Sequence, residues 1–150
     1  MDLGYVLAHW EQVRTGLYAT IDKFRDDELD ARPYAGGWSV RQIVLHIAQE
    51  ERGEFGYGVV QTLDAFPAEY ATHMYPTKVA LQALLEAVHT PTIAYLRERE
   101  PNDLARVVDT PWGASYRLIE MIGHMVEHEI HHRGELSLIL GMLGRSGFDA

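Results

Sequence analysis

Apolar residues recur at steps of three and four along most of the chain, which is the spacing of one face of an α-helix. The first such run covers residues 3–24, and its apolar face is made by Leu3, Val6, Leu7, Trp10, Val13, Leu17 and Ile21. Comparable runs predict further helices at residues 40–63, 79–100 and 116–143.

Residues with strong end preferences mark the limits of these helices. Ser39 is a favoured N-cap, and Gln42 three residues later completes a capping-box pattern. Thr77 suits the N-cap of the third helix, and Gly144 is a natural stop for the last one. The pattern therefore predicts where three of the four helices begin or end.

Two helices contain residues that disfavour an α-helix. The second carries Gly53, Gly56 and Gly58, each costing roughly 1 kcal/mol relative to alanine. Either this helix is interrupted there, or the glycines allow another backbone segment or a ligand to come close. In the third helix, Pro91 predicts a kink or a break near residues 89–90.

The segment 102–115 has a short β-branched run followed by Asp109, Pro111 and Gly113, which favours a loop or a small hairpin. No other stretch predicts a sheet. Four long helices with short connections predict an all-α fold, an up-and-down four-helix bundle. At 150 residues, the chain is expected to form a single domain over residues 1–150.

Composition narrows the function by exclusion. The net charge of −9 should repel nucleic acids and anionic membranes, so neither is an expected partner. No apolar run reaches the ~18 residues of a membrane-spanning helix, and the polar N-terminal segment does not resemble a signal peptide. A cytoplasmic location is the default expectation. The chain has no cysteine, so any transition metal must be held by histidines and carboxylates.

Half of the eight histidines lie in the segment 124–135, HMVEHEIHHRGE. His124, His128 and His132 follow one another at steps of four, which places them on nearly the same side of a helix. Imidazoles one turn apart are able to share a metal ion. We therefore predict that His128 and His132 are metal ligands, while His131 points to solvent.

A metal site that keeps an open position needs about three protein ligands, and one helix cannot surround an ion. The third ligand must come from another helix. His46 is the best candidate, because it faces a polar strip in the middle of the second helix. Glu50, Glu127 and His124 are its rivals. Three imidazoles suit zinc or nickel better than iron or cobalt.

Two segments of the chain resemble the DinB family of bacterial proteins. They are WSVRQIVLH, from Trp38 to His46, and HEIHHRGEL, from His128 to Leu136. The resemblance extends over nearly the whole chain. It implies a four-helix bundle, often a homodimer, that binds a divalent metal through three histidines matching His46, His128 and His132. Glu135 stands where the family commonly has glutamine, which adds a carboxylate near the site.

The resemblance also suggests a reaction, because relatives in the family include metal-dependent thiol transferases. In those enzymes the metal takes up a low-molecular-weight thiol and lowers its pKa, which produces a thiolate nucleophile. A small-molecule electrophile would be the second substrate. Under this hypothesis Glu50, Tyr57, His124 and Glu135 line the pocket as acid, base or orienting groups.

Two alternatives stay open. The chain also matches the H-E-x-x-H signature of metal-dependent hydrolases, in which Glu129 would activate water. We interpret Glu129 as incidental, because the extension of the longer signatures is missing. In the other alternative, the protein is a non-enzymatic, stress-associated dimer that the metal stabilises. The sequence alone leaves it uncertain whether the protein is an enzyme.

Overall fold

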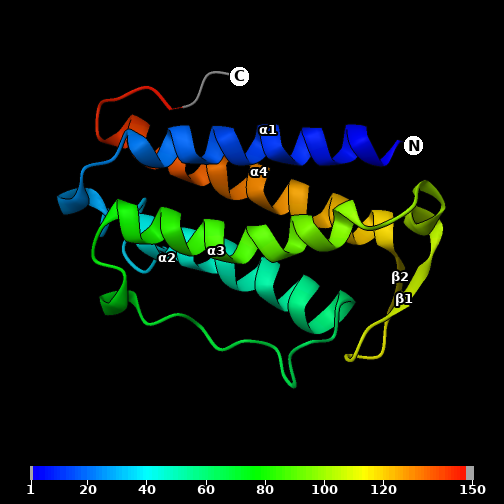
Figure 1. Ribbon diagram of the computed structural model, residues 1–150. Helices are drawn as coiled ribbons and strands as arrows, with labels where there is room; N and C mark the ends of the chain where they lie inside the picture. The colour runs from blue at the N-terminus through cyan, green and yellow to red at the C-terminus, as the bar shows by residue number, and fades with distance from the viewer. Residues whose placement is uncertain (1, 148–150) are drawn as a thin grey trace.

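The computed structural model describes residues 2–147 and contains a bundle of four helices (Figure 1). The helices are α1 (Leu3–Asp22), α2 (Val40–Glu51), α3 (Lys78–Arg97) and α4 (Leu118–Met142). Four single-turn or short helical segments join them: η1 (Asp26–Glu28), η2 (Arg52–Val59), η3 (Thr72–Met74) and η4 (Pro101–Ala105). The four-helix bundle predicted from the sequence is thus confirmed. No helix within residues 2–147 has the length and apolar character needed to cross a membrane.

The four helices do not simply alternate in direction along the chain. α2 and α3 run parallel, because the connection 60–77 returns along the whole length of α2 before α3 begins (Figure 1). Hydrogen bonds fix this return: Gln49 reaches the carbonyl of Pro67, and Arg41 at the start of α2 reaches that of Tyr75. α1 packs against α4 and α3, whereas α2 packs against α3 and α4. α1 and α2 therefore lie diagonally across the bundle.

The helix ends follow the expected capping chemistry. The Ser39 hydroxyl accepts a hydrogen bond from the Gln42 amide N–H, and the Gln42 side chain accepts one from the Ser39 N–H. The Thr77 hydroxyl caps α3 by accepting a hydrogen bond from the Ala80 N–H. Gly144 adopts φ = 78° just after α4, the left-handed conformation that favours glycine. These three predictions are confirmed.

The glycine-rich end of the second helix changes geometry, so the predicted helix over 40–63 stops early. α2 gives way at Arg52 to η2, a π-helix that ends at Val59. Gly53 packs under the ring of Phe66, and Gly58 under that of Trp112; a Cβ atom at either position would lie within 2.5 Å of the ring. The first explanation of these glycines is therefore correct, because the α-helix is interrupted. The groups that come close to Gly53 and Gly58 are aromatic side chains, where another backbone segment or a ligand was expected.

Two further predictions need adjustment. α3 is continuous from Lys78 to Arg97 with Pro91 inside it, so the helix has no break near residues 89–90, and the kink stays a prediction. The segment 102–115 does contain a hairpin, formed by β1 (Val107–Asp109) and the antiparallel β2 (Ser115–Arg117). α4 consequently begins at Leu118, two residues later than expected.

The apolar core consists of two halves. One half holds Trp10, Phe55, Ile93 and Met125, and the other holds Leu17, Ala48, Leu85 and Leu136. A layer of buried polar residues separates them, with one residue from each helix: Arg14, Glu51, His89 and Glu129. The candidate metal centre lies beside this layer, between α2 and α4.

Candidate metal centre

Three histidines from two helices converge between α2 and α4. The Nε2 atom of His128 lies 3.1 Å from Nε2 of His46 and 3.1 Å from Nε2 of His132. The spacing of four on α4 places the rings of His128 and His132 one turn apart, with centroids separated by 4.4 Å. α2 supplies the third ring at 4.9 Å from each. The three residues predicted as ligands are thus brought together.

Hydrogen bonds on the far side of the rings orient their lone pairs. Nδ1 of His132 lies 2.6 Å from Oε2 of Glu135, and a carboxylate only accepts, so Nδ1 carries the proton. Nε2 of neutral His132 therefore presents a lone pair to the other two rings. Nδ1 of His46 lies 3.9 Å from Oε1 of Glu50, so this carboxylate is near the ring but beyond direct hydrogen-bond distance. A carboxylate behind a ligating imidazole is the usual arrangement in metal sites.

The environment keeps the three imidazoles neutral. Burial and then the charge of His132 lower the pKa of His46 to about 4. Burial and then the neighbouring histidines lower the pKa of His128 to about 3. Burial also lowers the pKa of His132, although Glu135 opposes that shift. Neutral imidazole is the form that binds a metal ion, so the cluster is in its ligating state at neutral pH.

Trp38 forms one wall of the site, which the sequence reasoning did not anticipate. Its ring lies 4.6 Å from that of His46 and is stacked 6.1 Å from that of His132. The residue is 46% exposed, so it lies between the histidines and solvent. Trp38 is the first residue of the motif WSVRQIVLH, directly before the N-cap Ser39. That motif was the one signal in the sequence that pointed to this residue.

The other predicted pocket residues are distributed unevenly. Glu50 and His124 lie on the same side as the histidines, and the rings of His124 and His128 are 6.3 Å apart. Burial raises the pKa of Glu50, with His124 opposing the shift. Glu135 contacts His132 as described. Tyr57 lies farther along η2, where it contacts Phe66 and Trp112 instead of a histidine.

Three further acidic or histidine residues differ in their exposure: Glu54, Glu127 and His131. Glu54 is half-buried, and burial raises its pKa while His124 opposes the shift; sequence reasoning had not selected it. Glu127 is exposed, which removes it as a rival ligand. His131 is exposed as predicted, with its side chain 67% accessible.

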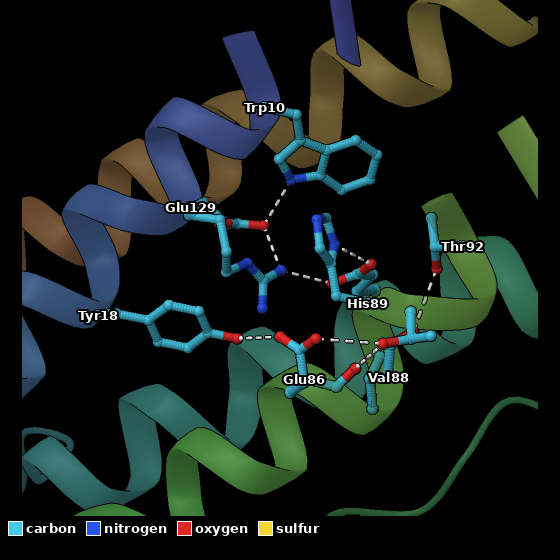
Figure 2. Close-up of polar contacts among 10 residues, drawn as sticks. Trp10, Tyr18, Glu86, Val88, His89, Thr92 and Glu129 are labelled. Carbon is cyan, nitrogen blue, oxygen red and sulfur yellow. Dashed lines mark hydrogen bonds and ion pairs between the residues drawn. The ribbon is translucent and has the colours of Figure 1, made fainter. Parts of the chain in front are cut away.

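Glu129 lies in the polar layer of the core, next to Trp10 (Figure 2). Its Oε1 accepts hydrogen bonds from Nε1 of Trp10 at 2.6 Å and from Nη2 of Arg14 at 2.5 Å. The same Nη2 donates to Oε2 of Glu51 at 2.5 Å, and Nδ1 of His89 lies 2.8 Å from Oε1 of Glu51. All five residues are buried. Glu129 is therefore engaged in an internal ion pair.

The ion pair shapes the protonation of this network. Burial alone would lower the pKa of Arg14, but the Glu129 and Glu51 carboxylates raise it above its usual value. Burial raises the pKa of Glu129, and Arg14 only partly opposes it. Burial also acts to raise the pKa of Glu51, but hydrogen bonding to His89 and the charge of Arg14 lower it overall. A guanidinium thus fills the position between two carboxylates.

Three clusters in the described part of the chain place enough ligand atoms within 4.8 Å of one another for a metal ion. The first is His46, His128 and His132. The second, His131 with His132 and Glu135, shares a residue with the first and lies at its exposed edge. The third is formed by Glu51, His89 and Glu129, where Arg14 already occupies the centre. The donor set of the first cluster fits a divalent ion best, since three neutral nitrogens face one another.

Comparison with known proteins identifies relatives of similar length. A protein of Oceanobacillus iheyensis, provisionally named a metal-dependent hydrolase, is 25% identical over 128 residues, which cover 79% of this chain and 74% of that protein. A protein of Bacillus mycoides with the same provisional name is 24% identical over 137 residues, covering 85% and 79%.

Solved structures share the fold. YfiT from Bacillus subtilis, described as a probable metal-dependent hydrolase with an unusual four-helix bundle topology, has a TM-score of 0.73 at 22% identity, over 97% of this chain and 89% of its own. A DinB-like protein of Bacillus subtilis, YjoA, has a TM-score of 0.72 at 17% identity, over 97% and 96%. The sequence profile of the DinB superfamily matches residues 9–136, and the chain therefore belongs to the DinB superfamily.

Proposed function

We propose that His46, His128 and His132 bind one divalent metal ion and that the protein is a metal-dependent enzyme acting on a small molecule. The observation that carries the proposal is the convergence of three Nε2 atoms from two helices. Burying neutral imidazoles with facing lone pairs is unfavourable unless a cation lies between them. Zinc or nickel is the proposed ion, because both accept imidazole ligands readily.

Hydrolysis is the reaction we favour. A divalent ion at this centre would supply a Lewis acid that polarises a bound carbonyl or phosphoryl oxygen. Glu50 is the proposed proton acceptor: it lies beside His46, and burial raises its pKa towards the range useful for a general base. Trp38 limits the access of water on one side. The provisional names of both relatives support this choice.

Thiol transfer is the second candidate, and the position of Glu129 favours it. The glutamate of an H-E-x-x-H hydrolase must reach the metal side of its helix, but here it is buried in the ion pair with Arg14. A centre that activates a thiol needs no such glutamate. Under this proposal a low-molecular-weight thiol is the cosubstrate, and His124 and Glu135 orient the reactants.

Activity assays on zinc-loaded and nickel-loaded protein distinguish the two reactions. One panel contains small esters, amides and phosphoesters; the other pairs low-molecular-weight thiols with electrophiles. Hydrolysis predicts turnover in the first panel and a loss of about 10²–10⁴-fold in Glu50→Gln. Glu127→Gln is the matched control, since that residue is exposed on α4. Thiol transfer predicts turnover only in the second panel.

Metal-loaded protein that is inert in both panels would contradict the enzymatic proposal and favour a non-enzymatic metal-binding protein. The homodimer remains part of the proposal, and the exposed apolar residues Ile130, Leu138 and Met142 on α4 are its candidate contacts. Sedimentation of the protein with Leu138→Glu, compared with the wild type, tests that contact directly. A wild-type monomer would contradict it.

A further inference from the structure

A cavity lies between α3, η2 and the connection 60–77. Its volume is about 550 Å³, within the range of pockets that hold small molecules. Phe55 of η2, Leu63 of the connection and Val88 of α3 are among the apolar side chains that line it. Figure 1 shows the course of the connection along the bundle, and Thr62, Leu63, Tyr70 and Tyr75 of this connection line the cavity. None of the three histidines lines the cavity.

The cavity stays open because small or ring-shaped residues stand where large side chains would fill it. Gly56 of η2 and Ala87 of α3 both line it. Pro91, one turn after Ala87, also lines it and has no N–H, so it removes the α-helical donor of the Ala87 carbonyl. α3 therefore presents small side chains to the cavity, and the Ala87 carbonyl lacks the N–H donor that an α-helix normally supplies.

Charge distinguishes this cavity from the rest of the molecule. The protein has a net charge of −9, yet no aspartate or glutamate lines the cavity. Arg52 is its one charged lining residue, and it is exposed at the rim. Within residues 2–147, the guanidinium of Arg52 has no carboxylate within 4.0 Å, and its contact is the hydroxyl of Tyr70 at 3.3 Å.

The aromatic side chains add a polar rim to the apolar interior. Tyr70 and Tyr75 meet edge to face, with ring centroids 5.7 Å apart. The Tyr95 hydroxyl accepts a hydrogen bond from Arg106 at 2.8 Å, and Tyr95 also lines the cavity. An apolar body would lie against these rings, while an anionic group would reach Arg52.

We propose that this cavity binds a small amphipathic monocarboxylate, with its apolar chain against Phe55, Leu63 and Val88 and its carboxylate paired with Arg52. The pairing explains why the cavity carries one positive and no negative side chain in an acidic protein. An arginine donates charge-assisted hydrogen bonds to a carboxylate, which are roughly twice as strong as neutral ones. This site is independent of the metal centre.

Calorimetric titration of the full chain tests the site with octanoate as the probe. 1-Octanol has the same chain without the charge, and acetate has the charge without the chain. Octanoate is expected to bind at one site per chain, 1-octanol more weakly and acetate not at all. No saturable binding of octanoate, or equal affinity for octanoate and 1-octanol, would overturn the proposal.

Matched variants locate the binding. Arg52→Gln should weaken octanoate binding about tenfold, the loss of one charge-assisted pair, and leave 1-octanol unchanged. Arg97→Gln removes an equal charge from an exposed residue elsewhere and should have no effect. Ala87→Leu, a helix-compatible change, should weaken octanoate binding by occupying part of the cavity, whereas Ala94→Leu on the same helix should not.

The carboxylate of octanoate is also a ligand for metal ions, so the variant His128→Ala serves as a control for binding at the metal centre. Retention of octanoate binding in His128→Ala is the expected result. Its loss there, or an undiminished affinity for octanoate in Ala87→Leu, would place the carboxylate at another site and overturn the proposal. Failure of the metal centre and failure of this cavity are therefore distinguishable.

Discussion

Two clusters of polar residues share the helices α2 and α4, and they differ in how their buried polar groups are paired. In the polar layer of the core, Arg14 supplies a cation between the carboxylates of Glu51 and Glu129 (Figure 2). In the histidine cluster, three imidazoles face one another through Nε2 atoms, and their pKa values are lowered. The first cluster contains its own counter-charge, whereas the second presents lone pairs.

The difference shows why close ligand atoms alone do not identify a metal site. Both clusters place ligand atoms within 4.8 Å. Two carboxylates already paired with a buried guanidinium have no need of a metal ion. In the histidine cluster the accepting Nε2 atoms face one another, and burial opposes the protonation that would turn one of them into a donor. A divalent ion satisfies them together.

The largest expected effect follows from removing the internal cation. Arg14→Met should lower the free energy of unfolding by about 3–5 kcal/mol, because it leaves two buried carboxylates without their partner. Arg97→Met, which breaks an exposed ion pair with Glu11, should cost about 1 kcal/mol or less. Urea unfolding of metal-free protein measures both. Similar losses in the two variants would contradict a structural role for Arg14.

The second effect concerns the histidine cluster. His128→Ala should weaken zinc binding by more than the roughly 10–100-fold typical of a change outside the ligand set. His124→Ala, one turn earlier and exposed, is the matched control and should stay within that range. Competition against a chelator gives both affinities. Equal losses would show that His128 is not a ligand.

Acid should destabilise the metal-free histidine cluster. The pKa values of His46 and His128 fall from 6.5 to about 4 and about 3 on folding, so below pH 6.5 the unfolded chain binds protons that the folded chain does not. The free energy of unfolding is highest above pH 6.5 and declines towards pH 4, by up to about 1.4 kcal/mol per pH unit for each histidine.

Urea unfolding between pH 4 and 7 measures this decline. The double variant His46→Gln, His128→Gln should lose that part of the slope and keep the part due to carboxylates, such as Glu51 with its lowered pKa. A slope identical in the variant and the wild type would show that the two imidazoles are not held neutral.

The smallest expected effect is at Glu135. Glu135→Gln keeps an acceptor for Nδ1 of His132 but removes the negative charge, so zinc binding should weaken by about tenfold or less. The same competition assay measures it. A loss as large as that of His128→Ala would mean that Glu135 itself binds the metal.

The features predicted correctly from the sequence are those that depend on short-range patterns of residues. Helical periodicity, the caps at Ser39 and Thr77 and the spacing of His128 and His132 each depend on residues close along the chain. The parallel course of α2 and α3 was not predicted, because it depends on the path of the long connection 60–77.

The polar layer was missed for a similar reason. Arg14, Glu51 and Glu129 are one residue from each of three helices, and 37 and 115 positions separate Arg14 from its two partners. A single charged residue in an amphipathic helix has no periodic signal. Glu129 had been interpreted as incidental to metal binding, and its buried ion pair supplies the role that the sequence did not show.

Anomalous diffraction from crystals of zinc-loaded protein tests the central claim most directly. The account predicts one strong peak per chain, about 2.0–2.1 Å from Nε2 of His46, His128 and His132. The polar layer should show none, because Arg14 occupies it. A peak among Glu51, His89 and Glu129, or no peak at the three histidines, would contradict the account.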